Sequence, residues 1–305
     1  MTRLAVRNFG KSLPEGVHSA LVSSLIILKF VVPFYILSDV LLYFDLLRPL
    51  GILLTPLTKL LHLPVETAPA LIGGMTLNVY TAIAFAAPLP LTPYQWTILG
   101  IFIGVCHSLV IESTIMLRLG ISTLYSIVLR FSVALLAASP LLVLPPAFLQ
   151  AAEAGKGNLN IRPHFESFMP MLLHSVGQAF LLAAKVILLV CVLILIMDWI
   201  KSLSVVKAHV ERVNTAFSII VGQLLGITYG AGILLREASR GSLQQRDIFF
   251  IGTFLMVCHS CIEDVLIFAL FGANFWIILT LRLLAALLIS YLLLRIFPYR
   301  KVMRT

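Results

Sequence analysis

Charged residues are scarce in this sequence. Asp, Glu, Lys and Arg make up 11% of the 305 residues, whereas hydrophobic residues make up 60%. A soluble domain carries about 25% charged residues, so this composition excludes an ordinary soluble domain. Several apolar runs reach the roughly 20 residues that a helix needs to cross a bilayer. The sequence therefore predicts an all-α polytopic membrane protein whose surroundings are the lipid bilayer.

Other absences exclude whole classes of function. No Gly-x-x-x-x-Gly-Lys-Ser/Thr motif is present, so nothing indicates a site that hydrolyses ATP or GTP. The four cysteines lie in apolar runs, which argues against a disulfide framework. The first apolar run follows a basic segment and is too long for a cleavable signal peptide. The net charge of +9 fits cytoplasmic loops better than a nucleic-acid surface, so no nucleic acid is expected as partner.

The chain repeats itself at a constant offset of 152 residues (259 minus 107). Shared apolar composition does not explain why histidine, cysteine and arginine recur at this offset, so two homologous halves are predicted. The predicted order is a cytoplasmic basic tail (1–14), a first repeat (15–148), a polar linker (149–166), a second repeat (167–297) and a basic tail (298–305). The matched positions include Cys106-His107-Ser108 with Cys258-His259-Ser260, Gly100 with Gly252, Glu112 with Asp264, Gly120 with Gly272 and Arg130 with Arg282.

Each half contains four apolar segments. The second segment of each half, at about 65–88 and 213–235, has glycine and hydroxyl residues at its centre. This predicts a re-entrant hairpin at a transporter binding site, with a glycine-rich packing helix as the alternative. The hairpin leaves more Lys and Arg on the inside, as the positive-inside rule favours. The other segments lie at about 19–44, 95–118, 121–144, 170–199, 247–271 and 274–296.

The expected architecture is therefore two inverted repeats, each with three transmembrane helices plus one re-entrant hairpin. Both termini are expected to be cytoplasmic, in the inner membrane of a bacterium. The sequence is compatible with a homo-oligomer as well as with a monomer.

The segment LIGGMTLNVYTAIAF, residues 71–85, resembles the gating signature in the membrane domain of FeoB-type ferrous-iron permeases. That signature is a glycine-rich turn followed by Asn-Val-Pro. Here Tyr80 stands in place of the proline, and Thr76 in place of a cysteine of the iron permeases. The chain thus resembles the Gate-domain, or "nucleoside recognition", family. Concentrative nucleoside transporters share its plan of hairpin, broken helix and helix, repeated with inverted topology, which implies a permease.

Two acid–arginine pairs are predicted inside the apolar runs. Glu112 lies eight residues before Gly120 and Arg130 lies ten residues after it, so the two side chains reach a similar depth on antiparallel helices. Asp264 and Arg282 repeat this arrangement in the second half. Ionisable residues inside a membrane are costly and are functional candidates by default. The interpretation favoured here is structural: two buried ion pairs that hold the helices together.

The two Cys-His-Ser clusters supply candidate metal ligands, because imidazole and thiolate suit transition metals such as iron, zinc, copper and nickel. Glu263 follows His259 by four residues and is expected to orient its ring. Two alternatives stay open: contact with an organic substrate or a proton, and a purely structural role at a helix break. The candidate ligands are Cys106, His107, Cys258, His259, Cys261 and Glu263.

Neutral hydrogen-bonding side chains gather at the predicted hairpin tips and near the clusters. Helix ends at such tips offer free N–H and C=O groups to a solute, and neutral groups suit a nucleoside-like or other polar organic molecule. The candidate substrate-binding residues are Thr76, Asn78, Tyr80, His107, Ser108, Gln223, Thr228, Tyr229, His259 and Ser260.

The leading hypothesis is a secondary transporter or permease that moves a small solute by alternating access. The two candidate substrates are a divalent transition metal and a nucleoside-like organic solute, and no resident cofactor is expected. A non-transporting membrane scaffold is the alternative from another class. An intramembrane thiol enzyme is disfavoured, because Cys106 and His107 are adjacent and would point about 100° apart on a helix, so the thiolate lacks a base.

Overall fold

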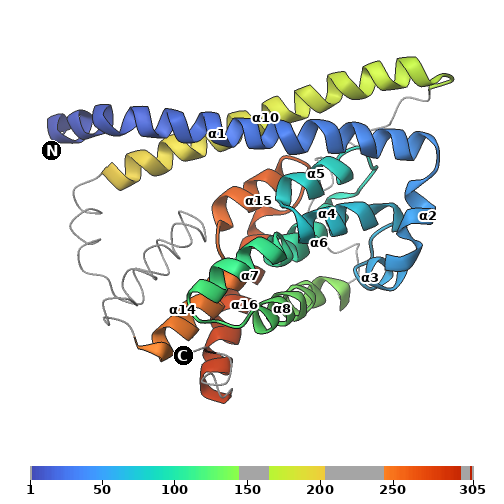
Figure 1. The fold of residues 1–305 in the computed structure, drawn as a ribbon. Helices are drawn as coiled ribbons and strands as arrows, with labels where there is room; N and C mark the ends of the chain where they lie inside the picture. The colour runs from blue at the N-terminus through green and yellow to red at the C-terminus, as the bar shows by residue number, and fades with distance from the viewer. Residues whose placement is uncertain (1, 144–164, 203–243, 297–302, 304–305) are drawn as a thin grey trace.

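The computed structural model describes residues 2–143, 165–202, 244–296 and 303 (Figure 1). Within these ranges the chain is helical apart from turns and one isolated β-bridge between Ile121 and Met303. This confirms the predicted all-α class. The second predicted hairpin, with Gln223, Thr228 and Tyr229, lies outside the described residues, as does most of the predicted linker.

Within the described residues, six helical segments are long and apolar enough to cross a membrane, which confirms the predicted apolar spans. The expected hairpin segment at 65–88 is not among them. Helix α1 already begins at Thr2, so the predicted basic tail continues the first span as helix. The six segments are Gly16–Tyr43 in α1 (Thr2–Tyr43), Pro93–Arg118, Thr123–Val143 (α8), Phe168–Met197 in α10 (Phe168–Ser202), Gln245–Ala269 and Phe275–Ile296 (α16).

Helices α1 and α10 form an outer layer on one side of the molecule (Figure 1). They pack along each other, and α1 also covers the short helix α5 (Val79–Ala86). Many of their apolar side chains point outward: Leu25 and Leu188 are each 67% exposed. In a helix that satisfies its own backbone hydrogen bonds, such side chains are suited to face lipid.

Two of the six spans are broken near their middle. Helix α6 (Pro93–Cys106) is followed by α7 (Leu109–Arg118), and α14 (Gln245–Val257) is followed by α15 (Cys261–Ala269). At each break a serine is left-handed, with φ 47° at Ser108 and φ 48° at Ser260. This conformation costs a residue with a side chain about 1–2 kcal/mol. Such strain persists only where the surrounding structure enforces it, which is often at a functional site.

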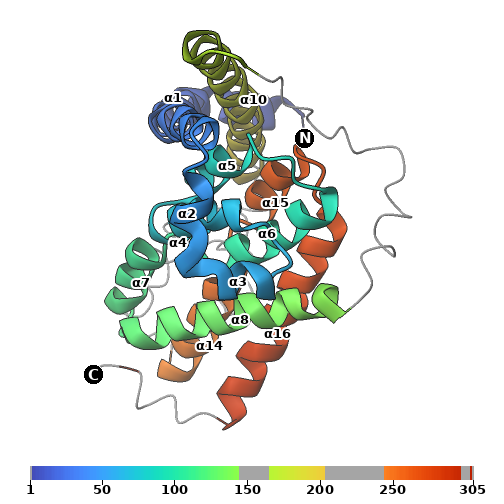
Figure 2. The same ribbon diagram turned by 90° about the vertical axis from the view of Figure 1, so that its right-hand side faces the viewer.

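The two broken spans cross in opposite directions. The start of α6 lies beside the end of α15, where Trp96 stacks on Phe271 with ring centroids 4.5 Å apart. The start of α14 lies beside the turn after α7, where the rings of Tyr125 and Phe249 are 5.6 Å apart. Figures 1 and 2 show α6 next to α15. Because the spans run antiparallel, their two breaks meet in the interior.

Two short helices, α4 (Ala68–Thr76) and α5, pack on each other and turn at residues 77–78. A nine-residue helix is about 14 Å long, less than half of a bilayer core, so neither helix crosses a membrane. The Asn78 side chain caps α5 by accepting the Thr81 N–H at 2.9 Å. Short helices α2 (Leu47–Gly51) and α3 (Thr55–Leu60) lead from α1 to this pair. We call α4 and α5 the helical hairpin.

The helical hairpin rests on the first break. The Ser108 N–H donates to the Gly74 carbonyl at 3.0 Å, and the Ser108 hydroxyl donates to the Leu77 carbonyl at 2.7 Å. These two carbonyl groups lie at the end of α4, where a helix leaves acceptors without an internal partner. Ser108 therefore joins the helical hairpin to the broken span.

Candidate metal centre

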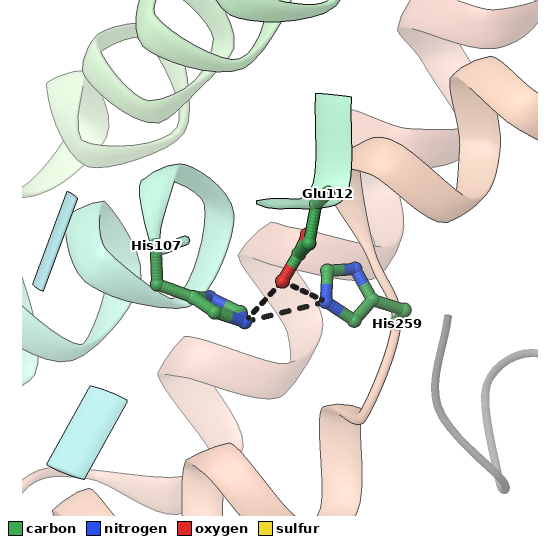
Figure 3. Close-up of side chains that lie close together, drawn as sticks. All are labelled: His107, Glu112 and His259. Carbon is green, nitrogen blue, oxygen red and sulfur yellow. Dashed lines mark hydrogen bonds and ion pairs between the residues drawn. The ribbon is translucent and has the colours of Figure 1, made fainter. Parts of the chain in front are cut away.

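Three side chains converge where the two breaks meet: His107, Glu112 and His259 (Figure 3). The Nε2 atoms of the two histidines are 3.3 Å apart. Glu112 Oε1 lies 3.0 Å from His107 Nε2 and 3.3 Å from His259 Nε2. All three residues are at most 7% exposed. His107 and Glu112 come from the first half and His259 from the second, so the site exists only when both halves are folded together.

Backbone carbonyls define the tautomer of each histidine. His107 Nδ1 lies 3.0 Å from the Ile103 carbonyl oxygen, and His259 Nδ1 lies 2.7 Å from the Leu255 carbonyl oxygen. A carbonyl oxygen only accepts, so each Nδ1 carries the hydrogen. In the neutral rings both Nε2 atoms then present lone pairs to each other and to the Glu112 carboxylate. Three acceptors facing one another are stabilised by a cation bound between them.

The spacing of these three atoms fits a transition-metal ion. Zinc binds histidine nitrogen and carboxylate oxygen at about 2.0–2.2 Å, and two such ligands in a tetrahedron lie about 3.3 Å apart. The observed separations of 3.0, 3.3 and 3.3 Å match one face of that tetrahedron. Metal-bound histidines usually donate their other ring N–H to a carbonyl or carboxylate, as both do here. Among the described residues, His107, Glu112 and His259 thus offer three ligand atoms, one fewer than a closed four-coordinate zinc site has.

Arg130 holds the remaining carboxylate oxygen of Glu112. Its Nη1 lies 2.9 Å from Glu112 Oε2, and the guanidinium is fully buried. The same guanidinium donates from Nε to the Val105 carbonyl at 2.8 Å and from Nη2 to the His107 carbonyl at 2.6 Å. Those carbonyls lie at the end of α6, which the break leaves without helical partners. Arg130 therefore caps a helix end and leaves Glu112 with one oxygen for a metal.

Arg282 plays the corresponding part in the second half, with one difference. Its Nη2 donates to the His259 carbonyl at 3.0 Å and also to the Gly104 carbonyl of the first half at 2.7 Å. Its Nη1 lies 3.5 Å from Asp264 Oδ2. Asp264 is one methylene shorter than Glu112 and pairs with Arg282 alone. The cluster is therefore asymmetric, with only one acid of the two repeats at the histidines.

We predict that Gly104→Ala destabilises the protein, because the new Cβ would lie 2.9–3.1 Å from atoms of the Arg282 guanidinium. That group is held by its bonds to two carbonyls and cannot move away freely. We expect a loss of about 1–3 kcal/mol, seen as a lower melting temperature in detergent. Gly177→Ala is the matched control, since nothing lies within 4 Å of its Cβ. Equal melting temperatures for both variants would contradict the prediction.

The cysteines depart from their predicted role as ligands. Cys258 and Cys261 are joined in a disulfide, with Cα atoms 6.1 Å apart, so neither offers a thiolate. Cys106 is a buried free thiol outside the three-ligand group. Placement in apolar runs argued against disulfides, but a turn between α14 and α15 brings two of these cysteines together.

Glu263 also departs from its expected role beside His259. Its Oε1 accepts a hydrogen bond from the Tyr80 hydroxyl at 2.8 Å, and the His259 ring is oriented by the Leu255 carbonyl instead. The four-residue spacing predicts a contact only within one continuous helix. Here α15 begins at Cys261, after His259, so the helical relation does not hold.

Four of the neutral groups predicted to contact a solute are hydrogen-bonded within the protein itself. Thr76 Oγ1 donates to the Ile72 carbonyl at 2.7 Å in its own helix. Asn78 caps α5, Ser108 holds the helical hairpin, and Tyr80 donates to Glu263. Ser260 lies at the second break. The residues that correspond to the hairpin partners of Ser108, at 226 and 229, fall outside the described residues, as do Gln223 and Thr228.

Comparison with known proteins adds one relative. The chain is 28% identical over 274 residues to a protein of Bacillus subtilis (strain 168) described as "Uncharacterized membrane protein YvoD". The match covers 86% of this chain and 87% of that protein. This is an integral membrane protein: its six apolar spans and this relative agree. No protein-family model and no solved structure matches the sequence.

Proposed function

We propose that this protein is a permease for a divalent first-row transition metal ion, which His107, Glu112 and His259 hold during transport. The observation that carries the proposal is the triangle of three ligand atoms, 3.0–3.3 Å apart, at the meeting point of two broken helices. Two imidazoles and one carboxylate suit zinc, iron, cobalt or nickel. Calcium and magnesium require six or more oxygen ligands and fit this set poorly.

The surroundings of the site favour transport over a structural metal site. A structural zinc site is closed by four protein ligands, whereas the described residues supply three here, which leaves the ion a position for an exchangeable ligand such as water. Broken helices that meet near the centre of a membrane domain are a recurring design of secondary transporters. The antiparallel broken spans support two inverted repeats, and the short α4 and α5 support a re-entrant hairpin. The likeness of residues 71–85 to the Gate-domain signature points the same way.

Within this proposal the ion moves by alternating access, with one half rocking against the other about the shared site. The two halves contribute ligands to one position, so a change in their relative orientation separates His259 from His107 and Glu112. An organic solute is the weaker candidate, because Thr76, Asn78 and Ser108, three of the described neutral groups expected to bind it, are already hydrogen-bonded within the protein.

The proposal is tested by metal binding and metal flux in the full chain. Purified protein in detergent is titrated with Co²⁺, whose absorption spectrum reports tetrahedral coordination, and proteoliposomes with a trapped zinc-sensitive dye report Zn²⁺ influx. We expect His107→Ala and His259→Ala each to weaken Co²⁺ binding by more than about 100-fold, beyond the 10–100-fold typical of residues outside the coordination shell. Both variants should also abolish Zn²⁺ influx.

The matched control is His174→Ala, which removes a histidine of α10 whose ring lies 5.2 Å from that of Phe165 and which is not one of the three candidate ligands. Its Co²⁺ binding and Zn²⁺ influx should equal those of the wild type. Wild-type protein that binds no Co²⁺ and admits no Zn²⁺ would overturn the metal proposal. A shared proton among the three acceptors, or a scaffold role, would then take its place.

A further inference from the structure

Three acidic side chains lie around the two breaks, and one of them has no cationic partner among the described residues. Glu112 pairs with Arg130, and Asp264 pairs with Arg282. Glu263 makes no ion pair within the described part of the chain, although it lies in the broken span Gln245–Ala269. An uncompensated carboxylate inside a membrane segment is costly and therefore a candidate for function.

Glu263 lies close to the candidate metal site but outside it. Its carboxylate interacts electrostatically with the His107 imidazole and with Asp264. It is only partly buried, whereas Glu112 and Asp264 are 5% and 6% exposed. Of the three acids, Glu263 is therefore the most exposed. Within the described residues its hydrogen-bond partner is the Tyr80 hydroxyl, at 2.8 Å.

Tyr80 connects this carboxylate to the helical hairpin. It is the second residue of α5 and lies two residues after Asn78, which caps that helix at the hairpin turn. The same turn is held by Ser108, the residue next to His107 in the sequence. The helical hairpin of the first half thus contacts both the break that carries His107 and the Glu263 carboxylate of the second half. A movement of the hairpin relative to α15 would break the Tyr80–Glu263 hydrogen bond.

We propose that Glu263 is the carboxylate that receives the divalent metal ion on its way to or from His107, Glu112 and His259, and that Tyr80 holds it until the helical hairpin moves. This rests on the proposed metal transport. A carboxylate oxygen replaces one water of the hydrated ion, and the three ligand atoms of the central site then replace further waters. The Tyr80 hydroxyl competes with the ion for Glu263 Oε1, which links entry to the position of the hairpin.

The test separates the rate of transport from the affinity of the central site. Glu263→Gln keeps an oxygen that accepts the Tyr80 hydrogen bond but removes the charge. In proteoliposomes we expect the initial rate of Zn²⁺ influx to fall at least about tenfold, because an electrostatically attracting group raises the rate of capture. The Co²⁺ dissociation constant in detergent should rise by no more than about threefold, with an unchanged absorption spectrum. Glu66→Gln, an acid between α3 and α4, is the matched control and should leave influx unchanged.

Tyr80→Phe tests the hairpin connection. It removes the hydroxyl and leaves Glu263 charged, so Zn²⁺ influx should be at least as fast as in the wild type. The Tyr80→Phe, Glu263→Gln double variant should be as slow as Glu263→Gln alone, because the hydroxyl acts only through that carboxylate.

Several outcomes would overturn the inference. One is wild-type influx in Glu263→Gln; another is a loss of Co²⁺ affinity as large as the loss of rate, which would make Glu263 a ligand of the central site. Slower influx in Tyr80→Phe would show that the hydroxyl does not restrain the carboxylate. If the wild-type protein neither binds Co²⁺ nor admits Zn²⁺, the metal proposal fails together with this one.

Discussion

Shortening Glu112 to aspartate is expected to remove metal binding while the fold survives. Glu112 Oε1 lies 3.0 and 3.3 Å from the two Nε2 atoms, and a side chain one methylene shorter cannot keep those distances. We expect the Co²⁺ dissociation constant of Glu112→Asp to rise at least about 100-fold and Zn²⁺ influx to stop.

The second half of the protein shows why the fold should tolerate this change. Asp264 occupies the position equivalent to Glu112 and still pairs with its arginine, Arg282, at 3.5 Å. An aspartate at position 112 is therefore expected to keep a weaker pair with Arg130. The melting temperature of Glu112→Asp should stay near the wild-type value.

Glu112→Gln provides the contrast, because it keeps the length of the side chain and removes the charge. Arg130 would then be a buried cation without a counter-ion, so this variant should lose both Co²⁺ binding and stability. Glu66→Asp makes the same chemical change as Glu112→Asp at a distant site and serves as control. Wild-type Co²⁺ affinity in Glu112→Asp would exclude Glu112 as a ligand.

Replacing Arg130 with methionine is expected to cause the largest loss of stability. The guanidinium is fully buried and binds Glu112 together with the Val105 and His107 carbonyls. Its removal leaves a buried carboxylate without a counter-charge and two carbonyl groups without donors. Breaking a buried pair in this way costs about 3–5 kcal/mol. Thermal unfolding in detergent, followed by tryptophan fluorescence, measures the loss.

Two further variants test whether the loss of stability comes from the buried, unpaired charge of Glu112. Arg48→Met removes an arginine whose side chain is 71% exposed and 3.9 Å from Glu66, so it should cost no more than about 1 kcal/mol. The Glu112→Leu, Arg130→Met double variant should recover part of the stability, because no charge is then buried alone. A double variant less stable than Arg130→Met would contradict this account.

The ion pair of Glu112 and Arg130 illustrates how far sequence reasoning reaches. The number of residues from each to Gly120 placed both at one depth, and the structure brings them to 2.9 Å. Such a prediction needs only the rise of a helix and an antiparallel neighbour. The apolar spans are predictable for a similar reason, since a bilayer of fixed thickness requires long apolar runs.

The position of Glu112 beside the histidines shows where the same reasoning stops. On an unbroken helix, two residues five positions apart point about 140° away from each other, which separates Glu112 from His107. The left-handed Ser108 ends that geometry and turns α7 so that Glu112 faces the His107 ring. The 152-residue repeat marks Ser108 and Ser260 as equivalent, but no pattern in the sequence states that either is left-handed.

The Cys-x-x-Cys pair is a second example. Its spacing suggested thiol ligands on one helical face, whereas a break between the two cysteines lets them bond to each other. Glu112 was expected to have a structural role because it pairs with Arg130. Its carboxylate, rather than a cysteine thiolate, lies beside the two histidines as the third candidate ligand.

By itself, the sequence determined that the chain lies in a membrane, that Cys-His-Ser recurs at an offset of 152 residues, and that one acid pairs with one arginine after each copy. Each follows from composition, from periodic spacing or from repetition, which are properties of the chain alone. Only the tertiary structure decided that His107 and His259 meet, and that Glu112 rather than Asp264 lies between them. That outcome depends on the direction in which two broken helices cross and on the length of one side chain, and both act only once the halves pack together.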